Sequence, residues 1–313
     1  MSPIFTPASG EYLRLYSRTL GLLVAMGAGV LSPGAGVLAP LVPYLVAAML
    51  FLSSLDLRVR RRSFRGSVWR ILAANVAIAF LGYLLLLPFD RTLALVAFLT
   101  GVTPTAISAP VIIEFLDGDV EVVVASVLAS NVCIALLLPF ALPIVAGTQA
   151  GISALRVLLS VFLVVCVPLF LSRGVSYLPG AVRLAARKGK ILSFYVWLVA
   201  LFIVTASSSA FLRRGANVSP GLLWAIAAVS LVVCVVSFTA GALLGGKGGR
   251  REGSQSLGQK NNSLTIWLAL AFINPVVALG PTWYVLYHNS WNSIQLIAFE
   301  RRKRAGRTVH PRQ

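Results

Sequence analysis

Long apolar stretches follow one another along almost the whole chain, and they constrain its fold more than any other feature. An α-helix needs about 20 residues to cross a bilayer. Ten stretches approach this length: 15–31, 37–55, 68–87, 92–115, 120–146, 152–171, 191–212, 222–244, 252–273 and 275–299. Only 12% of the 313 residues are charged, against about 25% in a typical soluble domain. The sequence therefore predicts an all-α polytopic membrane protein with ten transmembrane helices.

The basic residues indicate how these helices are oriented. The chain carries 27 Lys+Arg against 9 Asp+Glu, a net charge of +18. If the N-terminus is cytoplasmic, 22 of the 27 lie in cytoplasmic segments, four lie outside, and Lys260 lies within the ninth stretch. Positive residues collect on the cytoplasmic side of membrane proteins, so we expect a multi-pass cell-membrane protein with both termini in the cytoplasm. The basic clusters form short turns beside membrane helices, where the lipid bilayer attracts them, so no nucleic-acid partner is expected.

The ten stretches divide into two halves of five. We predict a first repeat at 1–147, a second repeat at 151–299 and a basic cytoplasmic tail at 300–313. Five crossings are an odd number, so the two halves insert with opposite orientations. In each half the fourth stretch is interrupted, and such paired interruptions point to a transport site between inverted repeats. This interpretation depends on hydropathy and spacing, because the halves share no convincing residue-level repeat.

The first interruption contains two prolines, Pro104 and Pro110. Each removes a backbone donor and disturbs the helix, and a broken backbone at membrane depth is tolerated only inside protein or beside an aqueous cavity. Thr103, Thr105 and Ser108 lie around the prolines, and we predict that they bind substrate. The alternative is an ordinary proline kink.

The second interruption is the polar run 254–263, which contains Lys260. A lysine at membrane depth is costly and usually functional. We predict that Asn261, Asn262 and Ser263 bind substrate, although they could instead satisfy freed backbone groups. The alternative for Lys260 is a cytoplasmic loop, with the ninth helix beginning at Asn262.

Five segments, in this order and spacing, resemble the bile acid:sodium symporter family, which belongs to a wider bile acid, arsenite and riboflavin transporter superfamily: 46–58, 101–104, 116–120, 258–264 and 272–288. The resemblance covers nearly the whole chain. It implies inverted five-helix repeats, with helices one, two, six and seven in a panel domain and the others in a core domain, where the broken fourth and ninth helices cross. It also implies alternating-access transport of a small or amphipathic organic anion, commonly driven by two sodium ions.

The residues that align with the family's sodium ligands are altered here. Asn75 and Asn131 keep oxygen-bearing side chains, whereas Ser256 replaces a glutamate and Lys260 replaces a glutamine. The site thus loses a negative charge and gains a positive one. One unit charge at about 4 Å is worth about 4 kcal/mol at an effective dielectric near 20, which is enough to empty a sodium site. We therefore predict a transporter without sodium coupling.

Lys260 would take the place of the sodium ion as a tethered charge. It could attract an anionic substrate, or it could exchange a proton and couple transport to protons, as in a proton-linked antiporter or an efflux carrier of the same superfamily. Glu114, one turn after Pro110, is the expected carboxylate partner, although it could equally be an interfacial residue. Gln259 completes the predicted coupling site.

Other chemistry is not expected. The three cysteines lie inside apolar runs without metal-ligand spacing, and there are only two histidines, so we predict no metal and no other cofactor. The chain lacks the paired aspartates, His clusters or nucleophile motif of a membrane-embedded enzyme, so an enzyme is only a distant alternative. Asp119 is expected to cap the fifth helix. The aromatic group is interpreted as an interfacial group and packing, and not as a ligand cage: Trp283, Tyr284, Tyr287, His288 and Trp291.

Overall fold

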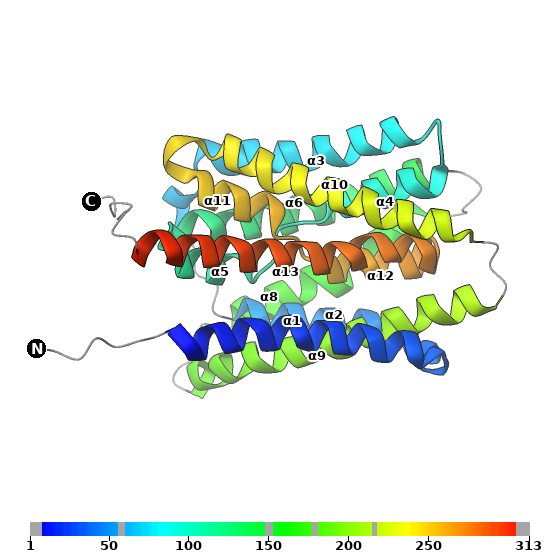
Figure 1. Cartoon of the computed structure of the whole chain (residues 1–313), viewed down its shortest axis with the longest axis horizontal. Helices are drawn as coiled ribbons and strands as arrows, with labels where there is room; N and C mark the ends of the chain where they lie inside the picture. The colour runs from blue at the N-terminus through cyan, green and yellow to red at the C-terminus, as the bar shows by residue number, and fades with distance from the viewer. Residues whose placement is uncertain (1–7, 56–59, 148–152, 177–180, 215–217, 305–313) are drawn as a thin grey trace, which may run out of the picture.

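The computed structural model describes residues 8–55, 60–147, 153–176, 181–214 and 218–304 (Figure 1). This part of the chain is helical and contains no strand, which confirms the all-α prediction. Its elements are α1 (Ala8–Leu31), η1 (Pro33–Leu41), α2 (Val42–Ser54), η2 (Arg61–Ser63), α3 (Gly66–Leu86), α4 (Arg91–Val102), α5 (Ala109–Phe115), α6 (Val120–Ala146), α7 (Ala154–Val161), η4 (Phe162–Cys166), α8 (Val167–Ser176), α9 (Ala181–Arg213), α10 (Pro220–Leu244), α11 (Gly246–Gly258), α12 (Asn262–Phe272) and α13 (Pro275–Arg304). The predicted boundary between the repeats, at 148–150, and the tail from 305 lie outside the described residues.

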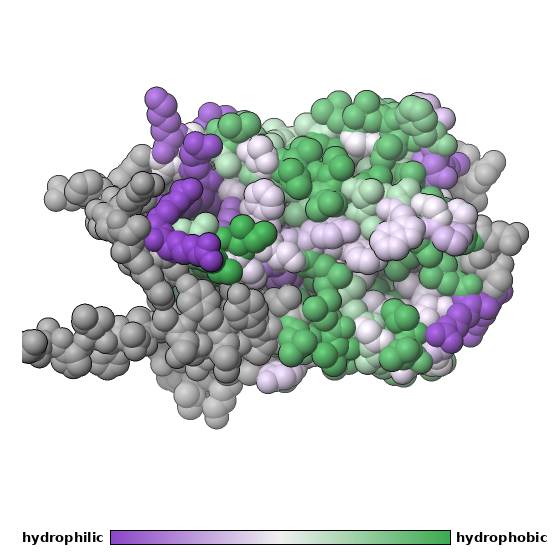
Figure 2. Space-filling view, in the orientation of Figure 1, coloured by the Kyte–Doolittle hydropathy of each residue, from purple (hydrophilic) through white to green (hydrophobic). Residues whose placement is uncertain are grey.

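Six helical segments are long and apolar enough to cross a membrane: Pro33–Ser54, Gly66–Leu86, Val120–Ala146, Ala154–Ser172, Leu192–Arg213 and Pro220–Leu244. Three shorter apolar helices accompany them, at Leu20–Leu31, Arg91–Val102 and Asn262–Phe272. Hydrophobic side chains cover much of the visible face, and strongly hydrophilic ones gather towards its two ends (Figure 2). These helices make the chain a membrane protein with several transmembrane helices.

The helices pack in two groups (Figure 1). In one group, α9 packs against α1, η1 and α2, and α8 packs against α2. In the other, α13 packs against α4, α10 and α12, while α3 packs against α4 and α6. The groups meet where α9 contacts α13 and where α2 contacts α12. The beginning of α1 and the end of α13 lie at the same end of the molecule, which is the arrangement that an even number of membrane crossings requires.

Glycines allow α11 to approach its neighbour α10 closely. A Cβ atom on Gly241 would collide with the carbonyl of Gly253, and one on Gly253 would collide with the carbonyl of Gly241. One turn further along α11, a Cβ on Gly258 would enter the ring of Phe238. Small residues of this kind let membrane helices pack backbone against backbone. They fix α11 beside α10 just before the second interruption.

Both predicted interruptions are present. The first separates α4 from α5, and the second separates α11 from α12. Two details differ from the prediction. Most of the polar run 254–263 is helical, because α11 continues to Gly258 and α12 begins at Asn262, so the second break is confined to residues 259–261. In the first half, Pro110 does not interrupt a helix. It is the second residue of α5, where the missing amide proton would have had no partner within the helix. The first break is therefore confined to residues 103–108.

Candidate functional site

The two interruptions lie against each other in the interior of the larger helix group. Thr105 and Lys260 form an isolated antiparallel bridge. On either side of it, the Ala106 N–H donates to the Gln259 carbonyl and the Asn261 N–H donates to the Pro104 carbonyl, both at 2.8 Å. Each broken segment thus satisfies backbone groups that the other leaves free. This pairing joins parts of the chain that are about 150 residues apart.

Lys260 is buried at this junction, with 2% of its surface exposed. Its ammonium donates to the Asn75 Oδ1, to the Gly101 carbonyl at 2.7 Å and to the Thr103 carbonyl at 3.2 Å. An ammonium group has three donors, and all three are used. The alternative placed Lys260 in a loop before a helix that begins at Asn262. α12 does begin at Asn262, but Lys260 is buried between the middle of α3 and the end of α4.

The chemistry of this pocket favours a cation. Two of the three acceptors are carbonyls at the C-terminal end of α4, where the helix dipole is negative. Asn75 bonds to the same helix end, since its Nδ2 donates to the Val102 carbonyl at 3.1 Å and to the Thr103 carbonyl at 3.2 Å. Its Oδ1 is thereby turned towards Lys260. The predicted coupling residues Asn75 and Lys260 are thus brought into direct contact.

The expected partnership between Lys260 and Glu114 is wrong. The Glu114 residue is exposed on α5, whereas Lys260 faces α3 and α4. Within the described ranges, no carboxylate forms an ion pair with Lys260. A spacing of one turn after Pro110 places Glu114 on a helix face, but it does not determine which helix that face meets.

Asn131, Thr105 and Ser256 meet on the other side of the junction. The Asn131 Nδ2 donates to the Thr105 carbonyl at 3.0 Å, and the Thr105 hydroxyl donates to the Ser256 carbonyl at 2.6 Å. Ser130 accepts from the Thr105 N–H at 3.0 Å. The Asn131 Oδ1 and the Ser256 Oγ are buried and have no hydrogen-bond partner. Two of the predicted coupling residues therefore keep oxygen atoms available here.

The predicted substrate-binding residues divide into two sets. Thr103 and Thr105 are buried and bonded within the protein, while Ser108 is exposed and accepts from Gln259 at 3.2 Å. Asn261 and Asn262 differ, because the Asn261 Nδ2 and the Asn262 Oδ1 are buried without a partner. Such atoms are rare in folded proteins and call for an explanation. A bound polar molecule would supply their hydrogen bonds.

Ser263 lies at the edge of the junction that faces the other helix group. It donates weakly to the Met49 sulfur at 3.8 Å. It also lines a small cavity together with Val42 and Val46 of α2, Trp197 and Leu201 of α9, and Ile266 of α12. The Trp197 Nε1 is buried without a hydrogen-bond partner. The surface of this cavity is apolar.

Sequence reasoning missed a row of polar residues on α13. Asn292 and Gln295 bond to the side chains of α11, the Tyr284 hydroxyl donates to the Gly258 carbonyl at 2.8 Å, and His288 lies 3.5 Å from the Asn262 amide. Tyr284 and His288 are at most 1% exposed, which agrees with the predicted packing, but their hydrogen bonds to the second break were not predicted. The available signal was the spacing 288, 292 and 295, which puts three polar side chains on one helix face.

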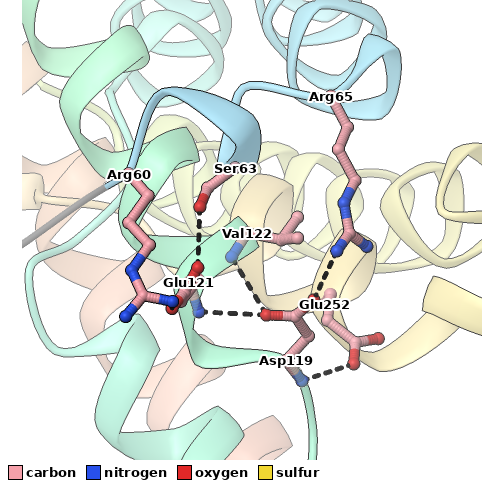
Figure 3. A network of polar contacts seen from close by, with 7 residues as sticks. All are labelled: Arg60, Ser63, Arg65, Asp119, Glu121, Val122 and Glu252. Carbon is pink, nitrogen blue, oxygen red and sulfur yellow. Dashed lines mark hydrogen bonds and ion pairs between the residues drawn. The ribbon is translucent and has the colours of Figure 1, made fainter. Parts of the chain in front are cut away.

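A second polar network ties the end of α5 and the start of α6 to α11 (Figure 3). Asp119 caps α6 as predicted, accepting from the N–H groups of Glu121 and Val122. It also pairs with Arg65 at 3.1 Å, and its own N–H donates to the Glu252 carboxylate at 2.8 Å. Glu121 accepts from Ser63 at 3.0 Å. The network holds α11 against the first broken helix.

A comparison with protein-family models finds no match to this chain, and a comparison with curated proteins finds none either. The fold and the site define a helical membrane protein whose two interrupted helices meet at a buried lysine. The resemblance to the bile acid:sodium symporter family is carried by the residue patterns alone, and it enters below as part of a proposal.

Proposed function

We propose that this protein is a secondary active transporter of the bile acid:sodium symporter type, which carries a small organic anion by alternating access. It would sit in the cell membrane with ten transmembrane helices in two inverted five-helix repeats and with both termini in the cytoplasm. Supporting this layout, the α4–α5 break and the α11–α12 break occupy the fourth position of each predicted half. The group of α1, α2, α8 and α9 would be the panel domain, and the group around α13 the core.

The observation that carries the proposal is the buried Lys260 ammonium at the junction of the two broken helices. A charge inside a membrane protein is costly and marks a pathway or site. Here the charge is held by dipoles, with no carboxylate beside it in the described part of the chain. The uncompensated positive field would attract an anion, and the unpartnered Nδ2 of Asn261 would donate to it.

The same observation supports transport without sodium coupling. Of the side chains that align with sodium ligands, Asn75 already accepts from Lys260 through its Oδ1, and Lys260 itself supplies a positive charge instead of an oxygen atom. A second cation within about 4 Å of the ammonium would meet a repulsion of about 4 kcal/mol at an effective dielectric near 20. Lys260 would instead serve as the resident cation. Exchange of its proton would make the protein a proton-linked antiporter or efflux carrier, which is the second candidate.

The test begins with a thermal-shift screen of organic acids against the purified protein, which selects an acid for radiolabelling. Proteoliposomes are then assayed for uptake of that acid under a sodium gradient, a proton gradient or neither. We expect uptake that is indifferent to sodium, and stimulation by the proton gradient would select the second candidate. Acceleration by sodium alone would contradict the proposal, and conversion of the acid to a product would indicate an enzyme.

Lys260→Gln gives the matching variant test. We expect it to lose uptake or to change its driving ion, because the resident charge is gone. Lys247→Gln is the control, since Lys247 is an exposed lysine in the first turn of α11. If both variants transport the acid like the wild type, Lys260 has no part in transport.

A further inference from the structure

We propose that Asn292 on α13 is a positioning residue for Lys260: it holds Gln259 from one side and thereby directs the Lys260 ammonium to the end of α4. A role of this contact in transport rests on the function proposed above, whereas the positioning of Lys260 does not. The geometry itself concerns the direction of one side chain.

The Asn292 carboxamide is bonded to α11 at both ends. Its Nδ2 donates to the Gln259 Oε1 at 2.6 Å, and its Oδ1 accepts from the Gln255 Nε2 at 2.9 Å. Gln255 belongs to the last turn of α11, and Gln259 is the residue that directly follows this helix. Asn292, Gln255 and Gln259 are all at most 4% exposed. A buried amide with both ends paired has one favourable orientation, so this contact sets the rotation of the end of α11 about its axis.

Gln259 and Lys260 are neighbours in an extended segment. Gln259 has φ −84° and ψ 103°, and Lys260 forms the bridge to Thr105. Successive side chains of an extended backbone point in opposite directions. Accordingly, Gln259 bonds to Asn292 and Ser108, whereas Lys260 bonds to groups on α3 and α4. Holding the first side chain therefore determines where the second one points.

α13 also holds the residue before Gln259. The Tyr284 hydroxyl donates to the Gly258 carbonyl at 2.8 Å, and the two backbone hydrogen bonds to Ala106 and Pro104 then align the strand. These bonds fix the path of the backbone. The Gln259 side chain is then held at its Nε2 by the exposed Ser108 and at its Oε1 by Asn292, which is the only described side chain that bonds to this oxygen.

The test measures the reactivity of Lys260 and needs no substrate. The purified full chain is treated with acetic anhydride across a pH series, well below its melting temperature, and acetylation of each lysine is read by mass spectrometry. Lys247, which is exposed, serves as the internal reference. In Asn292→Leu we expect Lys260 to be acetylated several-fold faster relative to Lys247, because its ammonium no longer stays bonded to three oxygen atoms.

Two further variants separate positioning from general loosening of the helix. Gln259→Met removes the same contact from the other side, so it should raise Lys260 acetylation in the same way even if Asn292→Leu does not fold. Gln295→Leu is the matched control, because Gln295 also joins α13 to α11 but contacts Gln255 and Ser254, not Gln259. It should leave Lys260 acetylation as in the wild type.

The proposal is overturned if the rate of Lys260 acetylation in Gln259→Met and in every folded Asn292 variant equals the rate in the wild type. It is also overturned if Gln295→Leu raises the acetylation of Lys260 as much as they do. Neither result bears on transport. Conversely, wild-type uptake by Lys260→Gln would remove the proposed function and leave the acetylation result standing.

Discussion

The hydroxyl groups of Thr103 and Thr265 lie 2.8 Å apart, although 162 positions separate them in the sequence. Thr103 is the residue at which α4 ends, and Thr265 belongs to the first turn of α12. The Thr103 hydroxyl also lies 2.7 Å from the Leu99 carbonyl, and the Thr265 hydroxyl lies 3.3 Å from the Asn262 carbonyl. A hydroxyl has one hydrogen, so one threonine donates to the other and the second donates to its carbonyl. The two broken helices are therefore joined by side chains as well as by their backbones.

This contact makes the two threonines energetically coupled. Thr103→Val and Thr265→Val should each lower the melting temperature of the purified protein, and the double variant should lower it by less than the sum of the two. We expect a coupling free energy of about 0.6 kcal/mol, the average of such contacts between membrane helices. A double-mutant cycle of thermal or denaturant unfolding measures it, and strictly additive effects would show that the hydroxyls do not interact.

Asn75 should matter more to stability than other single polar residues of the junction. Asn75→Leu removes its hydrogen bonds to the Val102 and Thr103 carbonyls and its bond to Lys260. The ammonium would be left with an unused donor, and an unmet hydrogen bond of a buried group costs about 1–3 kcal/mol, more if it is charged. Unfolding in detergent measures the loss. Ser126→Ala is a suitable control, since Ser126 is also buried but bonds only to its own helix.

Gly258 should tolerate no side chain. In Gly258→Ala the new Cβ would collide with the Phe238 ring, and overpacking of this kind costs about 1–3 kcal/mol. Gly27→Ala provides the comparison, because nothing lies within 4 Å of a Cβ built at Gly27. We expect a lower melting temperature for the first variant only. Equal melting temperatures would contradict the close approach of α10 and α11.

The network of Figure 3 predicts a graded effect at Asp119. Asp119→Ala loses the cap of α6 and the pairing with Arg65, and loss of a cap costs about 0.5–2 kcal/mol. Asp119→Asn keeps a capping oxygen and loses only the charge, so it should be closer to the wild type in thermal unfolding. An Asn variant as unstable as the Ala variant would mean that the ion pair, rather than the cap, stabilises this turn.

Local patterns in the sequence predicted much of the fold. The stretch 120–146 matches α6, and the interruption at Pro104 and the cap at Asp119 are where the sequence indicated. Hydropathy, proline geometry and capping depend on residues within a few positions of one another, so they can be read without a structure. The residues of the site were predicted in the same way, because a polar run inside an apolar chain is visible locally.

The partners of those residues were not predictable. Glu114 was expected beside Lys260 because of its helix position, and Asn292 was not expected at all. Which helix faces which is set by close packing between segments distant in the chain, such as Gly280 of α13 against Val96 of α4. Spacing along one helix carries no information about this choice.

The sequence by itself determined a helical membrane protein with two interrupted helices and one lysine in the second interruption. Only the tertiary structure decided that this lysine is buried and what it touches. Its ammonium bonds to Asn75 and Gly101, which are 185 and 159 positions away. The physical reason is that apolar length and helix breaks are properties of short segments, whereas the satisfaction of a buried charge depends on donors and acceptors that packing brings together.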